Sequence, residues 1–344
     1  MELTERKLRI LQAIISDYIM SAEPVGSRTL SKKFQLGISP ATIRNEMSDL
    51  EDLGYLTHPH TSAGRVPSDK AYRLYVNTLM EKHELSEMEK QAIANKLKAN
   101  VNEFDKTIEH AAKLLSEITN LTSFAMTPAQ NQDTLKFVNF LPVDESTVVL
   151  MIVSESGKIS NTALHMNEPY TEENLQILAK DITYTFKGMK LSDVLKDDII
   201  STFETDIAAM NKLAENIMPN FMRTLEDMLN VNLYMNGMTN IFDLPEYNDI
   251  ERAKSFLKLF DQKESLTKKL MERDDGIIVT IGDENEDGAL ADCSLITATY
   301  HVDGQLVGKI GVIGPTRMKY GEITSVVEYL TDNLNSTFRV EDDE

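Results

Sequence analysis

The first 75 residues hold the pattern that most restricts how this chain can fold, three helix signals in succession followed by a hairpin signal. From Thr4 to Met20 apolar residues recur every three or four positions, which predicts an amphipathic helix that Glu23-Pro24 ends. A second helix is expected from about Ser27 to Phe34, and a turn containing Gly37 follows it. This order predicts a small helical unit at the N-terminus.

The third helix is predicted to begin with Ser39 as the N-cap and Pro40 in the first helical position. Ile43, Met47 and Leu50 then share one face, and the opposite face of the first two turns is small and polar. A recognition helix needs such a face, because its N-terminal turns enter the major groove, where Asn can pair with adenine and Arg with guanine. The candidate DNA-binding residues on this helix are Ser39, Ala41, Thr42, Arg44, Asn45 and Ser48.

The segment behind the third helix predicts a hairpin. Tyr55 to His58 has the pattern of a strand, His60 to Gly64 that of a turn, and Arg65-Val66 that of a returning strand stopped by Pro67. Because a hairpin in this position is typical of a wing, we expect a winged helix-turn-helix. Ser68 then caps a fourth helix.

Basic and polar side chains outside the third helix are candidates for contacts with phosphates or with an adjacent minor groove. They are Arg28, Lys32 and Lys33 on the second helix, His58, His60, Thr61, Ser62 and Arg65 on the hairpin, and Lys70 and Arg73 on the fourth helix. His58 and His60 could instead be metal ligands, but no cysteine and no obvious third ligand lie nearby. We expect neither a metal nor a cofactor.

Charge is distributed unevenly along the chain. The whole sequence has a formal net charge of −20, but the first 75 residues carry +1 and the remainder −21. An acidic body is repelled by phosphate, so such a chain can meet DNA only through a locally basic face of its N-terminal unit. The carboxylates of the third helix must therefore point sideways or lie at the end away from the groove. They are Glu46, Asp49, Glu51 and Asp52.

Composition excludes several classes of protein. The longest aliphatic run, Val148 to Val153, is far shorter than the roughly 20 apolar residues of a membrane span. The N-terminus has no apolar signal-peptide core, so we expect a cytoplasmic protein with no membrane contact. Cys293 is the only cysteine, which rules out an intrachain disulfide and a cysteine-rich zinc site.

Two motifs imitate ligand sites. Asp283 to Gly288 begins like a calcium loop, but position twelve is Ser294 instead of glutamate, and we interpret the segment as a hairpin loop. Gly308, Gly311 and Gly314 imitate a dinucleotide fingerprint, yet they lie in a predicted strand, where close backbone packing explains them. With no Ser-His-Asp set, paired metal ligands or phosphate loop, we do not expect an enzyme.

Two separated stretches of the sequence resemble one family. The run from Ser39 to Leu56, continued from Pro59 to Pro67, is similar to the HrcA family of heat-inducible transcription repressors. The run from Gly308 to Tyr320 looks like a second signature of that family, whereas the middle of the chain matches only in pattern. The resemblance implies a winged helix, a GAF-like domain and a dimerising domain inserted into it. It also implies a target, the CIRCE inverted repeat upstream of chaperone operons, and a regulator, the GroEL chaperonin.

The expected fold class is therefore multidomain α+β. The predicted limits are 1–82 for the winged-helix DNA-binding domain, 83–130 for a helical connector and the start of the GAF-like domain, 131–229 for the inserted dimerising domain, 230–338 for the GAF-like domain and 339–344 for an acidic tail.

Element by element, residues 68–120 are expected to be nearly continuous helix, and 120–128 a mixed connecting segment. Strands are expected at Leu135–Phe140, Thr147–Val153 and Ile159–Leu164, with helices from Thr171 to about Asn230. The C-terminal part is expected to form a mixed sheet with a strand after Val231, two helices between Asp249 and Glu272, strands Ile277–Ile281, Ala291–Val302 and Gln305–Ile313, and a closing helix Met318–Phe338.

A single winged helix contacts too little duplex for regulatory affinity, so we expect a homodimer that reads an inverted repeat. The main hypothesis is a dimeric repressor of chaperone operons whose folded form is marginally stable and is maintained by GroEL. The alternative is a winged-helix regulator gated by a small molecule in the GAF-like domain.

Overall fold

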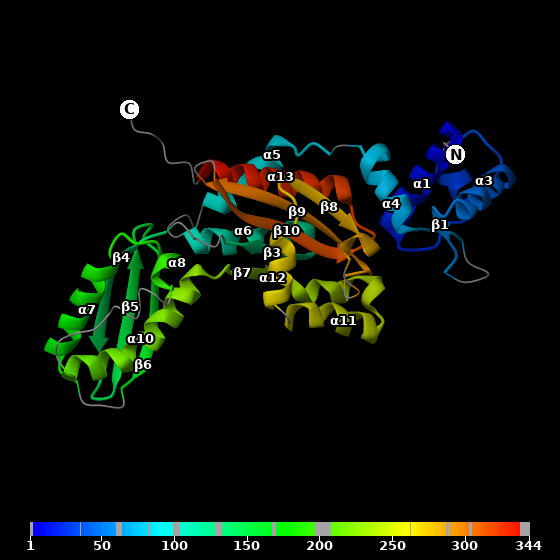
Figure 1. The fold of residues 1–344 in the computed structure, drawn as a ribbon. Coiled ribbons are helices and arrows are strands. Elements are labelled where there is room, and N and C mark those ends of the chain that lie inside the picture. Colours follow the sequence, from blue (N-terminus) through cyan, green and yellow to red (C-terminus); the bar gives the residue numbers. More distant parts are fainter. Residues whose placement is uncertain are drawn as a thin grey trace. The chain divides into compact units, whose positions relative to one another are not determined.

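The computed structural model describes residues 3–34, 36–59, 64–81, 83–98, 104–127, 133–166, 170–196, 208–261, 263–286, 288, 290–302 and 305–337 (Figure 1). The chain forms two compact units, one made of 1–127 together with 233–344 and the other of 128–232. Both contain helices and strands, so the fold is mixed α and β. The predicted acidic tail and the wing residues His60, Thr61 and Ser62 lie outside the described residues.

The N-terminal elements follow the predicted order. They are α1 (Glu5–Ser21), α2 (Ser27–Lys33), α3 (Pro40–Asp52), the antiparallel pair β1 (Leu56–Thr57) and β2 (Val66–Pro67), and α4 (Asp69–Leu74). The side chains of Thr4, Ser39 and Ser68 each accept a first-turn backbone N–H, which explains where α1, α3 and α4 begin. The returning strand ends at Pro67, where the sequence predicts its end, and Pro67 itself forms the last pair, with Leu56, in a two-stranded ladder that has edges on both sides.

These helices share a core. Ile10 and Ile14 of α1, Leu30 of α2, and Ile43 and Leu50 of α3 are all fully buried in one cluster. Because α3 commits its apolar stripe to this cluster, its opposite face is left at the surface.

The predicted continuous helix from 68 to 120 was wrong. The segment contains α4, a single π-helical turn η1 (Tyr75–Leu79), α5 (Glu87–Lys98) and α6 (Phe104–Thr119). A new helix starts at α5 because Ser86 and Glu89 form a reciprocal cap, in which Glu89 accepts the Ser86 N–H at 2.8 Å and Ser86 Oγ accepts the Glu89 N–H at 3.3 Å. The spacing of Ser86 and Glu89 in the sequence could therefore have predicted that a new helix starts here.

The larger unit is built on a five-stranded antiparallel sheet. Its order is β7 (Leu233–Asn236), β3 (Thr122–Met126), β10 (Gln305–Pro315), β9 (Cys293–Val302) and β8 (Ile277–Ile281). Helix α6 contacts β3, α13 (Tyr320–Thr337) contacts β9, and α12 (Lys263–Met271) contacts β10. The remaining elements are α11 (Ile250–Asp261) and the 3-10 turns η2 (Met238–Asp243), η3 (Pro245–Tyr247) and η4 (Gly282–Asn285).

Strand β3 was missed, because 120–128 was interpreted as a connecting segment. All five of its residues are buried, so the strand shows no alternation of apolar and polar positions. The other predicted strands of this sheet agree with the structure to within about two residues.

The C-terminal glycines are explained by close backbone packing, as the sequence predicts. A Cβ at Gly308 would collide with the Met126 carbonyl oxygen, and one at Gly311 with the Ile296 carbonyl oxygen. Both contacts lie inside the β3, β10 and β9 ladder. The segment from Asp283 connects the antiparallel neighbours β8 and β9 through η4, which agrees with its interpretation as a hairpin connection.

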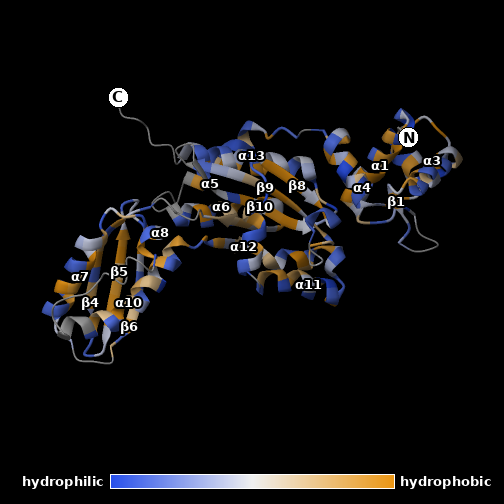
Figure 2. Ribbon diagram, viewed as in Figure 1, coloured by the Kyte–Doolittle hydropathy of each residue, from blue (hydrophilic) through white to orange (hydrophobic). Residues whose placement is uncertain are grey.

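The smaller unit contains the antiparallel sheet β4 (Leu135–Pro142), β5 (Thr147–Ser154) and β6 (Ile159–His165), in that order, and all three strands were predicted. It also contains α7 (Glu172–Phe186), α8 (Leu191–Val194) and α10 (Ala208–Leu229). Thr183 of α7 bonds to Val138 of β4, and Thr224 of α10 to Thr162 of β6, so both helices lie on the same face of the sheet. Figure 2 shows the hydrophobic residues along these strands.

Candidate nucleic-acid interface

Helix α3 has the two faces that its sequence predicts. Ile43, Met47 and Leu50 are buried, whereas Ala41, Arg44, Asn45 and Ser48 are exposed. Ser39 Oγ accepts the Thr42 N–H at 3.1 Å and lies 3.0 Å from Thr42 Oγ1, so both hydroxyls belong to the helix cap. The exposed face is therefore made of small and hydrogen-bonding side chains at the N-terminal half of the helix.

Three exposed cations of α2 and α3 have no ion-pair partner among the described residues. These are Arg28 and Lys32 of α2 and Arg44 of α3. They are free to meet a ligand with negative charge, as the sequence predicts for a phosphate backbone.

The carboxylates of α3 are paired with cations from other elements. Lys7 of α1 lies 2.7 Å from Glu46 and 2.8 Å from Asp49. The hydrogen bonds that Lys7 donates, to Asp49 first and then to Glu46, raise its pKa. The ammonium therefore stays charged and offsets two of the four negative charges on the helix. Lys7 was missed as a candidate, although two carboxylates three positions apart on a helix predicted to face DNA were a signal that a cation was needed.

Arg65 and His58 of the hairpin contact Glu51, a third carboxylate of α3. Arg65 lies 2.7 Å from its carboxylate, and the His58 ring contacts both Glu51 and Arg65. Arg65 is positioned by backbone hydrogen bonds to Val25, each 2.9 Å long. Arg65 and His58 of the hairpin are therefore bound to the C-terminal half of α3, and Asp52 remains exposed at its end.

Three predicted phosphate contacts are engaged elsewhere in the chain. Lys33 lies 2.7 Å from Asp17, whose side chain is only 9% exposed. Lys70 donates to the Leu53 carbonyl at 2.9 Å and lies 4.4 Å from the Tyr55 ring centroid. Lys33 joins α2 to α1, and Lys70 stabilises the C-terminal end of α3.

Arg73 is the third of these residues. Its guanidinium donates to Glu284 of η4 at 2.7 Å and to the Val279 carbonyl of β8 at 2.6 Å. Burial alone would raise the pKa of Glu284, but the bonds from Arg73 and from the Ile281 N–H lower it, so the pair stays ionised. Arg73 therefore attaches α4 to the five-stranded sheet and does not face the surface of α3.

Other kinds of site find little support in the described residues. They contain no group of three or more His, Cys, Asp or Glu side chains placed to hold a metal. Burial raises the pKa of the Cys293 thiol to about 12, which leaves it protonated and unreactive. Within the described ranges, no helix is both long enough and apolar enough to cross a bilayer.

Comparisons with known proteins show which family the chain belongs to. The family model described as HrcA protein C terminal domain matches residues 105–324. The heat-inducible transcription repressor HrcA of Desulfitobacterium hafniense is 39% identical over 99% of this chain and 99% of its own length. The protein of the same name from Clostridium tetani is 41% identical, over 98% of this chain and 97% of its own. A crystal structure of a hypothetical protein has the same fold, with a TM-score of 0.67 at 23% identity over 98% of this chain and 99% of that one.

The N-terminal surface and the names of these relatives define a transcription regulator, which is not an enzyme. The chain belongs to the HrcA family.

Lys32 and Lys33 are neighbours on α2, but only Lys33 is predicted to contribute to the stability of the fold. Replacing Lys33 with Met leaves the buried Asp17 carboxylate without its charged donor, and should lower the free energy of unfolding by about 1–3 kcal/mol. Lys32→Met is the matched control and should change it by less than about 0.5 kcal/mol, since Lys32 is exposed. Urea unfolding measures both, and equal stabilities of the two variants would contradict the role assigned to Lys33.

Proposed function

We propose that this chain represses class I heat-shock operons, which encode chaperones, by binding the CIRCE inverted repeat as a dimer, with its activity maintained by the GroEL chaperonin. In this proposal residues 1–82 are the winged-helix domain, 83–130 and 230–338 form the GAF-like domain, 131–229 dimerise, and the protein works in the cytoplasm. One observation carries the DNA-binding part: α3 exposes a small polar face while Lys7 and Arg65 hold three of its four carboxylates in ion pairs.

In this reading α3 is the recognition helix and β1 with β2 the wing. Asn45 and Arg44 read base edges, while Ser39, Ala41, Thr42 and Ser48 let the helix approach the groove. Arg28 and Lys32 contact phosphates, as do the wing residues His60, Thr61 and Ser62. Five other candidates are left out of the proposed contacts because each is bound inside the chain: His58, Arg65, Lys33, Lys70 and Arg73.

Asn45 and Lys32 should affect DNA binding in different ways. Asn45→Ala removes a base contact, so it should weaken binding to the operator by about 1–3 kcal/mol and hardly change binding to random DNA. Lys32→Ala removes a phosphate contact, so it should weaken both equally and lower the slope of log K against log salt by about one. Fluorescence anisotropy at several salt concentrations measures both, and equal losses on the two DNAs for Asn45→Ala would reject its role in base reading.

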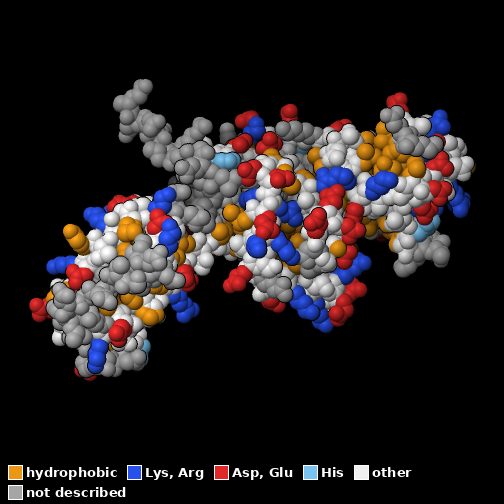
Figure 3. All heavy atoms as spheres, in the orientation of Figure 1, with side chains coloured by type: hydrophobic (Ala, Val, Ile, Leu, Met, Phe, Trp, Pro, Cys, Tyr) orange, Lys and Arg blue, Asp and Glu red, His pale blue; other side chains and the backbone are white. Residues whose placement is uncertain are grey.

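The smaller unit offers a surface for dimerisation. On the face of its sheet away from α7 and α10, Phe137 pairs with Val153 and Val153 with Ile159, so three apolar side chains form a row across the strands. Phe137 is 37% exposed and Ile159 60%. On the same face Leu141, which is 47% exposed, pairs with Val149, and the row of Asn139, Met151 and Asn161 lies between the two apolar rows. An exposed apolar sheet face of this kind fits an interface with a second copy of the chain, and Figure 3 shows hydrophobic side chains at the surface of this unit.

A charge on this face should separate the dimer. Phe137→Asp should raise the dimer dissociation constant by at least about tenfold, since it places an unpaired charge in an apolar contact. Tyr184→Asp is the control, because Tyr184 lies on α7 and is 91% exposed. Sedimentation velocity measures both, with thermal unfolding to confirm that each variant folds. A Phe137→Asp protein as dimeric as the wild type would place the interface elsewhere.

The link to heat rests on how the DNA-binding helices are supported. Buried residues of α1, α3 and α4 form one connected apolar cluster with residues of the five-stranded sheet and α13. Tyr72 of α4 and Tyr320 of α13 meet inside it, with ring centroids 6.0 Å apart. Loss of packing in the sheet would therefore remove support from the recognition helix, and a chaperonin that refolds the chain would restore it.

The chaperonin should restore heated repressor. After brief heating, footprinting across a chaperone-operon promoter should show reduced protection of the inverted repeat, and GroEL with ATP should recover it. Full protection with or without GroEL, before and after heating, would rule out this form of regulation.

A cavity beside α1 favours a second candidate function, a regulator gated by a small molecule. A change in operator affinity caused by such a molecule without any chaperonin would support it.

A further inference from the structure

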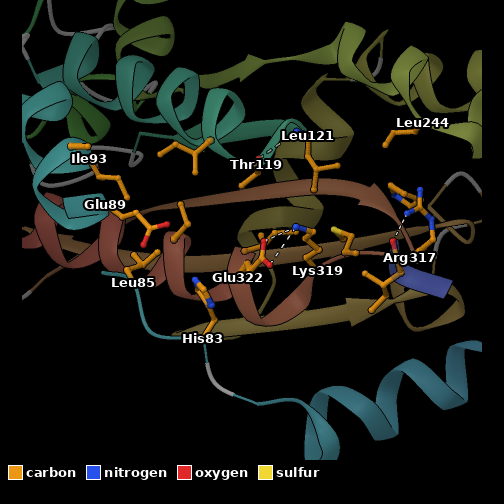
Figure 4. Close-up of a pocket in the computed structure, with 17 residues that line it drawn as sticks. His83, Leu85, Glu89, Ile93, Thr119, Leu121, Leu244, Arg317, Lys319 and Glu322 are labelled. Carbon is orange, nitrogen blue, oxygen red and sulfur yellow. Dashed lines mark hydrogen bonds and ion pairs between the residues drawn. The ribbon is translucent and has the colours of Figure 1, made fainter. Parts of the chain in front are cut away.

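A cavity of about 470 Å³ lies where α1, α5, α6 and α13 come together (Figure 4). This volume is within the range of small-molecule sites. Its walls are contributed by the end of α1, by the segment 83–85, by α5, and by the residues around the start of α13. It is therefore formed by the chain that connects the DNA-binding helices to the five-stranded sheet.

The floor of the cavity is apolar. Ile19, Leu121, Met318, Ile323 and Val326 line it and are all buried. Ile118, on the same wall as Leu121, is 38% exposed, so hydrocarbon in the cavity faces water. An apolar ligand would remove this surface from water, which is favourable in proportion to the area buried.

The charged groups at the cavity are mostly paired. Arg317 is held by Glu246, with Nε 2.5 Å from its carboxylate, and donates to the Ile19 carbonyl at 2.6 Å. Lys319 pairs with Glu322 at 3.0 Å, and both side chains are drawn in Figure 4. Neither cation is left to attract an anion.

Glu89 is different, because only one of its oxygens is used. Its Oε2 accepts from the Ser86 N–H at 2.8 Å and from Ser86 Oγ at 2.7 Å, and these bonds lower the pKa of the carboxyl. Its Oε1 has no hydrogen-bond partner within the described residues. The exposed rim of the cavity thus carries the Glu89 carboxylate, with His83 also in the lining, and one Glu89 oxygen has no partner in the part of the chain that the structure describes.

We propose that this cavity binds a small apolar molecule carrying one protonated amine, with its hydrocarbon part on Val326 and Ile323 and its ammonium group at Glu89. The lining of the same cavity includes Ile19 at the end of α1 and Arg317, which already joins α1 to the sheet. Occupancy therefore stabilises the junction that supports the recognition helix. The effect on repression rests on the proposed function, but binding itself does not.

Three naphthalenes of the same shape test the site on the full chain: 2-naphthylmethylamine, 2-naphthylmethanol and 2-naphthoate. The chain has no tryptophan, so the fluorescence of the probe can be followed directly. The amine should bind about five- to tenfold more tightly than the carboxylate, which is the scale of one partly exposed ion pair, and this preference should shrink at high salt. The affinity of the alcohol should lie between those of the amine and the carboxylate.

Matched variants of α5 locate the binding. Ala92→Phe fills the cavity and should weaken binding of the amine by at least about tenfold. Gln91→Phe is next to it but outside the lining, so this variant should bind the amine as tightly as the wild type does. Glu89→Gln should reduce the preference for the amine to about twofold, and Glu87→Gln, also on α5 but not in the lining, should keep it. Equal affinity for all three probes, or unchanged binding by Ala92→Phe, would overturn the proposal.

Operator binding is measured separately, with and without the amine. A change in operator affinity that Ala92→Phe abolishes supports the coupling to the recognition helix. Binding of the amine with no change in operator affinity overturns that coupling. A chain that binds the amine but not the operator refutes the proposed function and leaves the cavity site intact.

Discussion

The structure depends on how one acidic helix is held. Helix α3 carries four carboxylates in 13 residues and must still bury one face and expose the other. Residues of α1 and α2 pack against its apolar stripe, and Lys7 and Arg65 pair with three of its four carboxylates. If DNA is the ligand, this neutralisation is what lets an acidic helix lie against phosphate, since unpaired carboxylates at that distance would be repelled.

Other cations connect α3 and the neighbouring helices with the rest of the unit. Lys70 closes the end of α3, and Arg73, one turn along α4, bonds to β8 and η4. Arg317 adds a bond from the start of α13 to the end of α1. Together with the continuous apolar cluster, these contacts join the N-terminal helices and the five-stranded sheet in one compact unit. A family of heat-inducible repressors needs such a dependence if heat is to weaken DNA binding through loss of packing.

Much of the fold could be predicted because it is encoded locally. Caps at Ser39 and Ser68 mark helix starts, and the alternation of residues in the smaller unit marks its three strands. Strand β3 was missed, since a strand buried on both faces has no alternation to detect. Within the candidate site, the exposed face of α3 followed from helical periodicity, whereas the partners of Lys33 and Arg73 did not.

The sequence by itself determined the family, the order of the N-terminal elements and which face of α3 is apolar, because these depend on residue spacing within a single segment. Only the tertiary structure decided which cations remain free. Arg73 and Glu284 are 211 positions apart, and Lys7 and Glu46 are 39 apart. No local pattern reports such a pair, since the ion pair exists only after the packing of separate helices and strands has brought both charges to one place.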